Sequence, residues 1–149
     1  MRAGDLAKPF PTVSVDDDAL AAARIMAAEK SPGLIVCHAD GRPYTVLPGA
    51  QVLNFILPRY IQDDPALARA YAERAADEFR NKLVHHTVRE LLPRPADIAD
   101  LPAVTPAATT IEVAALMARL RSPLVAVVDQ NKVMGAITIN ALLTHLLTP

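Results

Sequence analysis

The sequence predicts a mixed α/β fold, of the α+β kind, in which one β-α-β-β-α unit occurs twice. The first observation is a repeat: shifting residues 13–52 onto residues 104–143 gives eight identities over forty positions. The second is that each copy follows the same order of an apolar stretch, a helix, a Ser-Pro dipeptide, two short apolar strands and a second helix. The third is size, since a half-length unit leaves one face of its sheet open. The two copies are therefore expected to pack sheet to sheet about a pseudo-twofold axis.

Composition indicates one compact unit and excludes several classes of partner. The chain has 149 residues, 52% of them hydrophobic, and a mean hydropathy of +0.22, which is not typical of a disordered protein. Its net charge is −1 and its 15 basic residues are not clustered, so we expect no nucleic-acid partner. No apolar run approaches the ~20 residues that span a bilayer, so we expect no membrane insertion and a cytoplasmic location. The single cysteine, Cys37, is expected to be a buried small hydrophobic side chain.

The first helix of each copy has local start and stop signals. In copy one it is expected over residues 17–30, where consecutive aspartates near the start favour the positive end of the helix dipole. In copy two, Thr109 and Glu112 have the spacing of a capping box. Both helices should end before Pro32 and Pro123, because proline restricts the residue that precedes it and cannot continue the hydrogen-bond ladder.

Two short strands and a second helix complete each copy. The β-branched runs "LIVC" and "LVAVV" are typical of buried strands, and each is followed by a polar turn, "ADGRP" or "DQNK". The runs "YTVL" and "VMGAIT" are expected to form the partner strands. The segments "GAQVLNFIL" and "NALLTHLL" then predict the closing helices, so both copies have the order β-α-β-β-α.

A helical insertion is expected between the copies, which divides the chain into residues 1–56, 57–86 and 87–149. Within the insertion, residues 63–83 have Asp64 as a helix N-cap and a proline at the first helical position. Apolar side chains recur every four residues along this segment and predict one amphipathic helix that packs on the core or on a second subunit. These side chains are Leu67, Tyr71, Ala75, Phe79 and Leu83.

Two stretches of the chain resemble cystathionine-β-synthase (CBS) domains. The first is "MRAGDLAKPFPTVSVDDDALAAARIMAAEKSPGLIVCHADGRP", and the second combines "TVRELLP" with "PAVTPAATTIEVAALMARLRSPLVAVVDQNKVMGAITINALL". Together they cover nearly the whole chain except the insertion. The resemblance implies a tandem CBS pair, or Bateman module, which is a regulatory unit that usually assembles as a disc-shaped homodimer. In many members the cleft between the two copies binds an adenine nucleotide such as AMP, ADP or ATP, or S-adenosylmethionine.

The resemblance implies a regulatory protein rather than an enzyme. Because the chain contains little beyond the pair, we expect it to sense a small molecule and to modulate a separate enzyme or transporter. The alternative is a scaffold that has lost ligand binding and keeps only the dimer. The residues themselves show no catalytic motif: no serine stands in a nucleophile elbow, the five glycines form no phosphate loop, and the four histidines lack the spacing of zinc ligands.

The ribose clamp of the family is incomplete in both copies. Nucleotide-binding members close each copy with Ser or Thr followed three residues later by Asp, whose carboxylate accepts hydrogen bonds from the ribose hydroxyls. Copy two has Thr138 but Ala141 at the Asp position, and copy one has Leu47 and Ala50. A lost bond of ~1.5–3 kcal/mol weakens affinity roughly 10–150-fold. Asn140 offers a weaker substitute or, in the interpretation that we favour, caps the last helix.

The other cleft positions of the family pattern are occupied by suitable residues. The resemblance places Val13 and Val104 as an apolar wall beside a purine, and the two Ser-Pro turns beside the base. A basic residue precedes each turn and is a candidate for contact with a phosphate, although a cation there also favours the negative end of a helix. Thr138 is the strongest single side-chain candidate. The candidate ligand-binding residues are Val13, Lys30, Ser31, Pro32, Val104, Arg121, Ser122, Pro123, Thr138 and Asn140.

Overall fold

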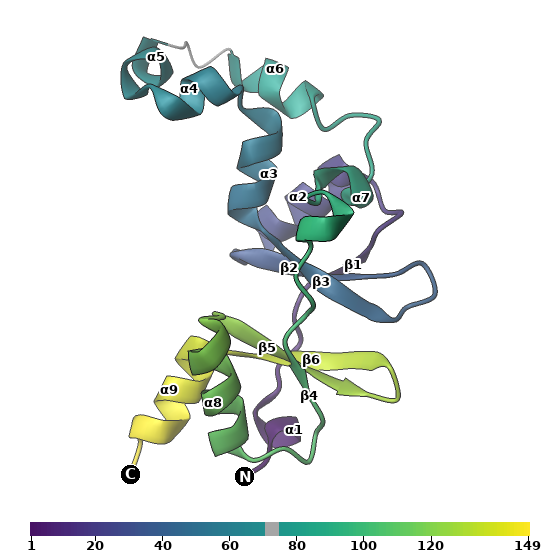
Figure 1. Ribbon diagram of the computed structural model, residues 1–149, viewed down its shortest axis with the longest axis vertical. Helices are drawn as coiled ribbons and strands as arrows, with labels where there is room; N and C mark the ends of the chain where they lie inside the picture. The colour runs from purple at the N-terminus through teal and green to yellow at the C-terminus, as the bar shows by residue number, and fades with distance from the viewer. Residues whose placement is uncertain (71–74) are drawn as a thin grey trace.

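Two stacked sheets form the centre of the molecule. The computed structural model describes residues 1–70 and 75–149. It contains two three-stranded sheets with the strand orders β1-β2-β3 and β4-β5-β6. Figure 1 shows the sheets facing each other near the middle of the molecule, with helices on their outer sides. The expected fold of two β-α-β-β-α repeats that pack through their sheets is confirmed.

Each repeat contributes three strands and two helices in the same order. Repeat 1 consists of β1 (Thr12–Ser14), α2 (Ala19–Ala28), β2 (Gly33–Cys37), β3 (Pro43–Pro48) and α3 (Gly49–Ile56). Repeat 2 consists of β4 (Ala103–Val104), α8 (Thr110–Leu120), β5 (Leu124–Asp129), β6 (Lys132–Thr138) and α9 (Ile139–Leu147). In both repeats the first strand is parallel to the second, and the second is antiparallel to the third.

The hairpin of repeat 2 is one residue shorter than that of repeat 1. Gly33 pairs with Pro48 in repeat 1, whereas the equivalent Leu124 pairs with Thr138 in repeat 2. The shorter hairpin closes through the two-residue turn 130–131, in which both residues have positive φ. Equivalent residues are therefore 91 positions apart before the turn and 90 positions apart after it.

The first helices begin where their caps place them. The carboxylate of Asp18 accepts a hydrogen bond of 2.8 Å from the backbone N–H of Ala21, so α2 is shorter than the expected range of 17–30. The capping box predicted at α8 is confirmed: Thr109 and Glu112 bond reciprocally to each other's backbone N–H at 3.2 and 2.8 Å.

Each repeat has its own apolar core, and a third cluster joins them. The joining cluster consists of Ile35 and Cys37 from β2 with Ala126 and Ala136 from the facing sheet. The two alanines leave room for the sheets to approach closely. Cys37 is 7% exposed, as the sequence predicted, and burial raises the pKa of its thiol.

Short segments are exchanged between the two cores. The N-terminal helix α1 (Ala3–Leu6) packs in the core of repeat 2, and Lys8 forms a β-bridge with Ala136 of β6. The helix α7 (Val88–Leu91), which precedes repeat 2, packs instead in the core of repeat 1. The expected boundaries at residues 56 and 87 follow chain order, whereas packing places each of these segments with the other repeat.

A helical arm projects from the end of α3 at the side of the molecule away from repeat 2 (Figure 1). It consists of α4 (Arg59–Asp63), α5 (Pro65–Ala70) and α6 (Ala75–Asn81), and a single turn of 3₁₀ helix, η1 (Pro95–Asp97), lies farther along the chain. The expected start of a helix after Asp64 is confirmed, because its side chain accepts from the N–H of Ala66 at 2.9 Å. None of the described helices, those of the arm included, is long and apolar enough to cross a membrane.

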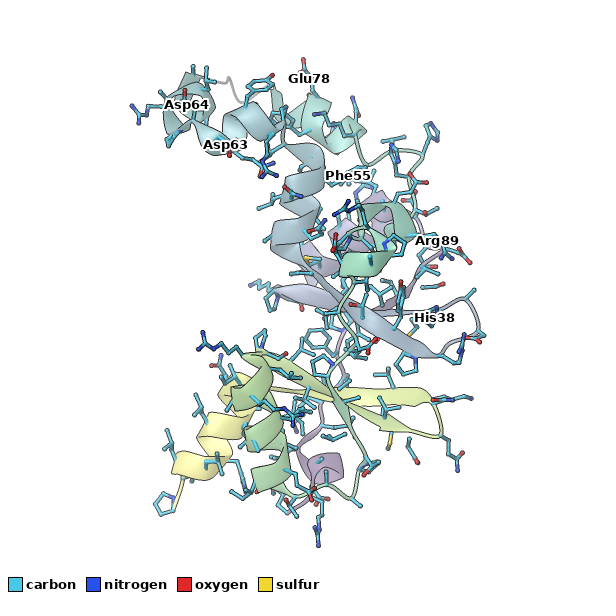
Figure 2. The ribbon with its side chains drawn as sticks, viewed as in Figure 1. His38, Phe55, Asp63, Asp64, Glu78 and Arg89 are labelled. Atoms are coloured by element: carbon cyan, nitrogen blue, oxygen red, sulfur yellow. The ribbon has the colours of Figure 1, made fainter. Side chains whose placement is uncertain are left out.

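The prediction of a single amphipathic helix over residues 63–83 is wrong at both ends. Asp63 is the last residue of α4, and Leu83 lies beyond the end of α6, where it is buried in the repeat 1 core. Leu67 is 41% exposed, and no residue of α5 is buried. Tyr71 lies outside the described residues. Figure 2 shows Asp63 and Asp64 at the junction of α4 and α5, far from both sheets.

Candidate ligand clefts between the two repeats

One cleft between the repeats takes its walls from both of them. This Asp100 cleft has a volume of about 480 Å³. Repeat 1 contributes the end of β3, and repeat 2 contributes the Ser-Pro turn, the end of α8 and the segment that leads into β4. Its lining residues are Thr45, Val46, Pro48, Ala99, Asp100, Pro102, Leu120, Ser122, Pro123 and Leu124.

A smaller cleft of about 300 Å³ occupies a related position beside repeat 1. This Glu29 cleft is lined by Pro9, Phe10, Pro11, Thr12, Ile25 and Glu29. The 91-residue shift places Pro11 on Pro102 and Glu29 on Leu120. The two clefts therefore share the segment before the first strand and the first helix, but the Glu29 cleft has no lining residue from the other repeat.

The Ser-Pro turns are held by their own hydroxyl groups. The Ser122 hydroxyl donates to the carbonyl oxygen of Leu124 at 2.6 Å, and the Ser31 hydroxyl donates to that of Gly33 at the same distance. The proline carbonyls that follow accept from the first N–H of the closing helices, at 2.8 Å in repeat 1 and 2.9 Å in repeat 2. Each turn therefore fixes the start of α3 or α9 against the end of the preceding helix.

Each cleft has one ionisable lining residue, and it is acidic. Asp100 is the only charged residue that lines the larger cleft, and Glu29 is the only one that lines the smaller cleft. Sequence reasoning missed both residues, because an isolated carboxylate in a connecting segment or at a helix end carries no motif. Among the described residues, no three or more His, Cys, Asp or Glu side chains gather as a metal site would require.

The comparisons with known proteins agree with this architecture. The model of the CBS domain family matches residues 88–148. A solved CBS domain-containing protein of unknown function from Kribbella flavida is 47% identical, with 99% of each chain covered and a TM-score of 0.89. The chain belongs to the CBS-domain family. No curated protein matches it.

More distant solved structures share the fold of this CBS pair. The CBS domain of a CBS domain-containing membrane protein from Sphaerobacter thermophilus is 20% identical, with a TM-score of 0.75, and covers 100% of this chain and 90% of its own. CBSX2 in complex with AMP is 16% identical, with a TM-score of 0.67, and covers 98% of this chain and 96% of its own. At these identities the likeness establishes the fold alone.

The clamp positions of this CBS pair differ from the sequence expectation in repeat 1. Because the hairpins differ by one residue, Thr138 corresponds to Pro48, and Ala141 corresponds to Gln51. The assignment of Leu47 and Ala50 to these positions is therefore wrong. Gln51 is neutral and so lacks the charge of the missing carboxylate, and its side chain is held by a hydrogen bond from Nε2 to the carbonyl oxygen of Leu91 at 3.1 Å. Gln51 thus ties α3 to α7.

Thr138, and not Asn140, caps the last helix. The Thr138 hydroxyl accepts from the N–H of Ala141 at 3.2 Å and is the N-cap of α9. Asn140 is the second residue of α9 and is exposed. The favoured interpretation of Asn140 as the cap is wrong, because α9 begins at Ile139, two residues earlier than a cap at Asn140 requires.

The two basic candidates lie outside both clefts. Lys30 and Arg121 each follow a helix and have a φ of 51°, the left-handed conformation typical of a helix end. Arg121 lines a separate groove between α8 and α9, on the other side of the Ser122-Pro123 turn. The structure therefore favours the helix-ending role over contact with a phosphate in either cleft.

The remaining candidates are divided between cores and clefts. Val13 is 4% exposed in the repeat 1 core but also lines a third cleft of about 400 Å³, to which repeat 2 contributes Lys132. Val104 packs against the repeat 2 core. Ser122 and Pro123 line the Asp100 cleft. Ser31 and Pro32 do not belong to the lining of the Glu29 cleft. The structure therefore brings one Ser-Pro turn, but not both, to a cleft surface.

Proposed function

We propose that this CBS pair is a regulatory module that binds a small molecule in the Asp100 cleft and modulates a separate protein, an enzyme or a transporter. CBS-pair proteins are generally regulatory, and one relative in the fold, CBSX2, has been crystallised with AMP. The observation that carries the proposal is that the cleft walls come from both repeats, with Val46 on one side and Leu124 on the other. A cleft of about 480 Å³ lies within the usual range for small-molecule sites, which is roughly 300–1,000 Å³.

The mechanism follows from this two-sided wall. A ligand that contacts β3 of repeat 1 and the Ser-Pro turn of repeat 2 prefers one spacing of the repeats over others. Its differential affinity shifts the population toward that spacing. The Ser-Pro turn transmits the change, because the Pro123 carbonyl accepts from the N–H of Ile139 at the start of α9. The outer helices then present a different surface to the partner.

A thermal-shift panel tests ligand binding. AMP, ADP, ATP, NAD and S-adenosylmethionine are each added at millimolar concentration to the purified chain. A ligand at 100 times its Kd stabilises the native state by about 2.7 kcal/mol and raises the Tm. Ala99→Trp fills the cleft from an exposed position and should abolish the shift. Ala96→Trp, an exposed alanine in η1 outside the cleft, is the matched control. A panel without any shift contradicts the proposal.

The α8–α9 groove supports a homodimer as the second part of the proposal. This groove has a volume of about 440 Å³ and is lined mostly by apolar side chains, with Arg121 and Ser122 as its polar lining residues. Ile139, Leu143 and Leu146 are each more than 40% exposed there. A second copy of the chain that covers them removes this apolar surface from water. Such a dimer is also what the scaffold alternative requires.

Light scattering tests the dimer and its location. The wild-type chain is expected to be a dimer with and without nucleotide, and Leu143→Glu should make it a monomer. Leu67→Glu, at an exposed leucine of the arm, is the matched control. If Leu67→Glu gives a monomer and Leu143→Glu does not, the arm is the interface and the groove is not. A dimer together with a silent ligand panel would support the scaffold alternative.

A further inference from the structure

We infer that the Asp100 cleft selects a small organic cation with an apolar body and discriminates against phosphate-bearing nucleotides. The inference rests on the proposed function, since it concerns the chemical class of the ligand that this cleft binds. It differs from the sequence expectation, in which a basic residue beside each Ser-Pro turn was a candidate for contact with a phosphate.

The charge of the cleft lining is the first argument. Asp100 is exposed, lines the cleft and is its only ionisable residue. Arg121, which precedes the Ser-Pro turn, lines the α8–α9 groove and not this cleft. Arg94 precedes the cleft segment, but its Nε lies 3.1 Å from Oδ2 of Asp97 in an exposed ion pair. A phosphate in this cleft would therefore face a carboxylate with no cation in the lining.

The state of the hydroxyl donors is the second argument. Phosphate oxygens require N–H or O–H donors. The Thr45 hydroxyl donates to the carbonyl oxygen of Ala99 at 2.6 Å, and the Ser122 hydroxyl donates to that of Leu124 at 2.6 Å. These are the two hydroxyl groups of the lining, and both protons are already engaged by backbone. The side chains that line the cleft thus offer an acceptor, the Asp100 carboxylate, and no free donor.

The second cleft repeats the same sign of charge from a different position. Glu29 is the only ionisable residue that lines the Glu29 cleft. The 91-residue shift pairs Glu29 with Leu120 and Asp100 with Pro9, so neither carboxylate has a counterpart in the other repeat. The linings of the Asp100 and Glu29 clefts are therefore acidic for independent reasons of sequence. A third cleft, between β1 and the β6 hairpin, differs from both because its lining includes Lys132 and His38 as well as Asp17.

The apolar part of the lining indicates which kind of uncharged group the ligand should carry. Three prolines, Pro48, Pro102 and Pro123, surround the cleft together with Val46 and Leu124. Proline rings are rigid and offer no side-chain hydrogen bonds, so they favour a flat or aliphatic apolar group. The preferred ligand therefore combines such a group with a positive charge within reach of Asp100.

Three adenosine probes that differ only at the 5′ position test the inference: 5′-amino-5′-deoxyadenosine, adenosine and AMP, which are cationic, neutral and anionic at pH 7. Binding is measured by calorimetry at low ionic strength, where charge effects are least screened. We expect affinity to fall in that order, by about threefold to fivefold at each step, as an exposed carboxylate allows. Asp100→Asn should reduce the difference between the probes, and Ala99→Lys should reverse the order. Asp129→Asn, an exposed carboxylate outside the cleft, should leave it unchanged.

The outcomes separate this inference from the proposed function. If AMP binds as tightly as the amino compound, or if Asp100→Asn leaves the order unchanged, the inference is wrong while ligand binding by the CBS pair stands. An AMP affinity that falls in Arg121→Gln would show that this side chain reaches over the turn, which also overturns the inference. If no probe binds, and the thermal-shift panel is silent as well, both proposals fail.

Discussion

Gln51 and Leu91 are joined by a hydrogen bond of 3.1 Å, from the side-chain Nε2 to the backbone carbonyl oxygen, across forty residues of sequence. Gln51 stands in the first turn of α3, and Leu91 ends α7. The bond therefore attaches the segment that precedes repeat 2 to the core of repeat 1. It also engages the residue at the position where the family resemblance led us to expect a ribose carboxylate.

Replacing Gln51 should loosen this attachment. Gln51→Met keeps the length of the side chain but removes the donor, and we expect a loss of about 1 kcal/mol in the free energy of unfolding. Gln51→Glu should cost more, because it places a carboxylate against the Leu91 carbonyl oxygen. Urea denaturation measures both. Equal stability of Gln51→Glu and the wild type would show that the bond contributes nothing.

The two Ser-Pro turns should contribute equally to stability. The Ser31 and Ser122 hydroxyls make the same 2.6 Å bond to the carbonyl oxygen two residues ahead. Each serine-to-alanine substitution should cost about 0.5–1.5 kcal/mol. The double variant should lose the sum, because the turns share no partner. Chemical denaturation of the three variants checks this, and a cost confined to one repeat would contradict it.

The Cys37 thiol should make stability depend on alkaline pH. Burial raises the pKa of this thiol above its ordinary value of 9.0. In the unfolded chain the proton is lost first, so the folded state binds more protons in the interval between the two pKa values. Stability should therefore be complete below about pH 9 and fall as the pH rises through the folded pKa. The difference between wild type and Cys37→Ala in denaturation curves from pH 7 to 10.5 isolates this effect from other titrating groups.

The same burial predicts slow chemistry at Cys37. The thiolate is the reactive form, and both its exposure and its population are low in the native protein at neutral pH. A thiol reagent should modify the native chain slowly and the urea-unfolded chain at once. Rapid modification of the native chain would show that the sheets separate often enough to expose the joining cluster.

Gly135 should be intolerant of a side chain because of the exchanged N-terminal segment. A Cβ at this position would lie 2.6 Å from the backbone carbonyl oxygen of Lys8. Gly135→Ala should therefore displace that segment and cost about 1–3 kcal/mol. The N–H of Ala136, which donates to the Lys8 carbonyl at 2.9 Å, reports on it by hydrogen exchange. Lys8→Ala keeps the backbone and should leave this exchange slow.

Much of the fold could be predicted because its signals are local. The capping box of Thr109 and Glu112 and the prolines that end both first helices act within one helical turn. The 91-residue repeat revealed two copies of one unit, and the apolar runs indicated which strands are buried. One unit cannot cover its own sheet, so the packing of two sheets also followed from the sequence.

The candidate site was less predictable because its geometry depends on strand register and on packing between distant segments. The second hairpin is one residue shorter, which moves the clamp position of repeat 1 from Leu47 to Pro48. A constant shift of the sequence against itself does not reveal this change, because the side chains at these positions differ between the repeats. The interpretation of Asn140 failed for a related reason, since Thr138 both ends β6 by pairing with Leu124 and caps α9, so the helix follows the strand directly.

By itself, the sequence determined two β-α-β-β-α units, their Ser-Pro turns, the capping box of α8 and the need for the two sheets to pack on each other. Short-range sterics, hydrogen bonding and apolar periodicity decide these features. The tertiary structure alone decided that α1 and α7 cross to the opposite cores, that Arg121 lies outside the larger cleft, and that Asp100 lies within it. These outcomes depend on which surfaces meet when the chain folds. Contacts between residues far apart in the sequence cannot be inferred from their spacing along it.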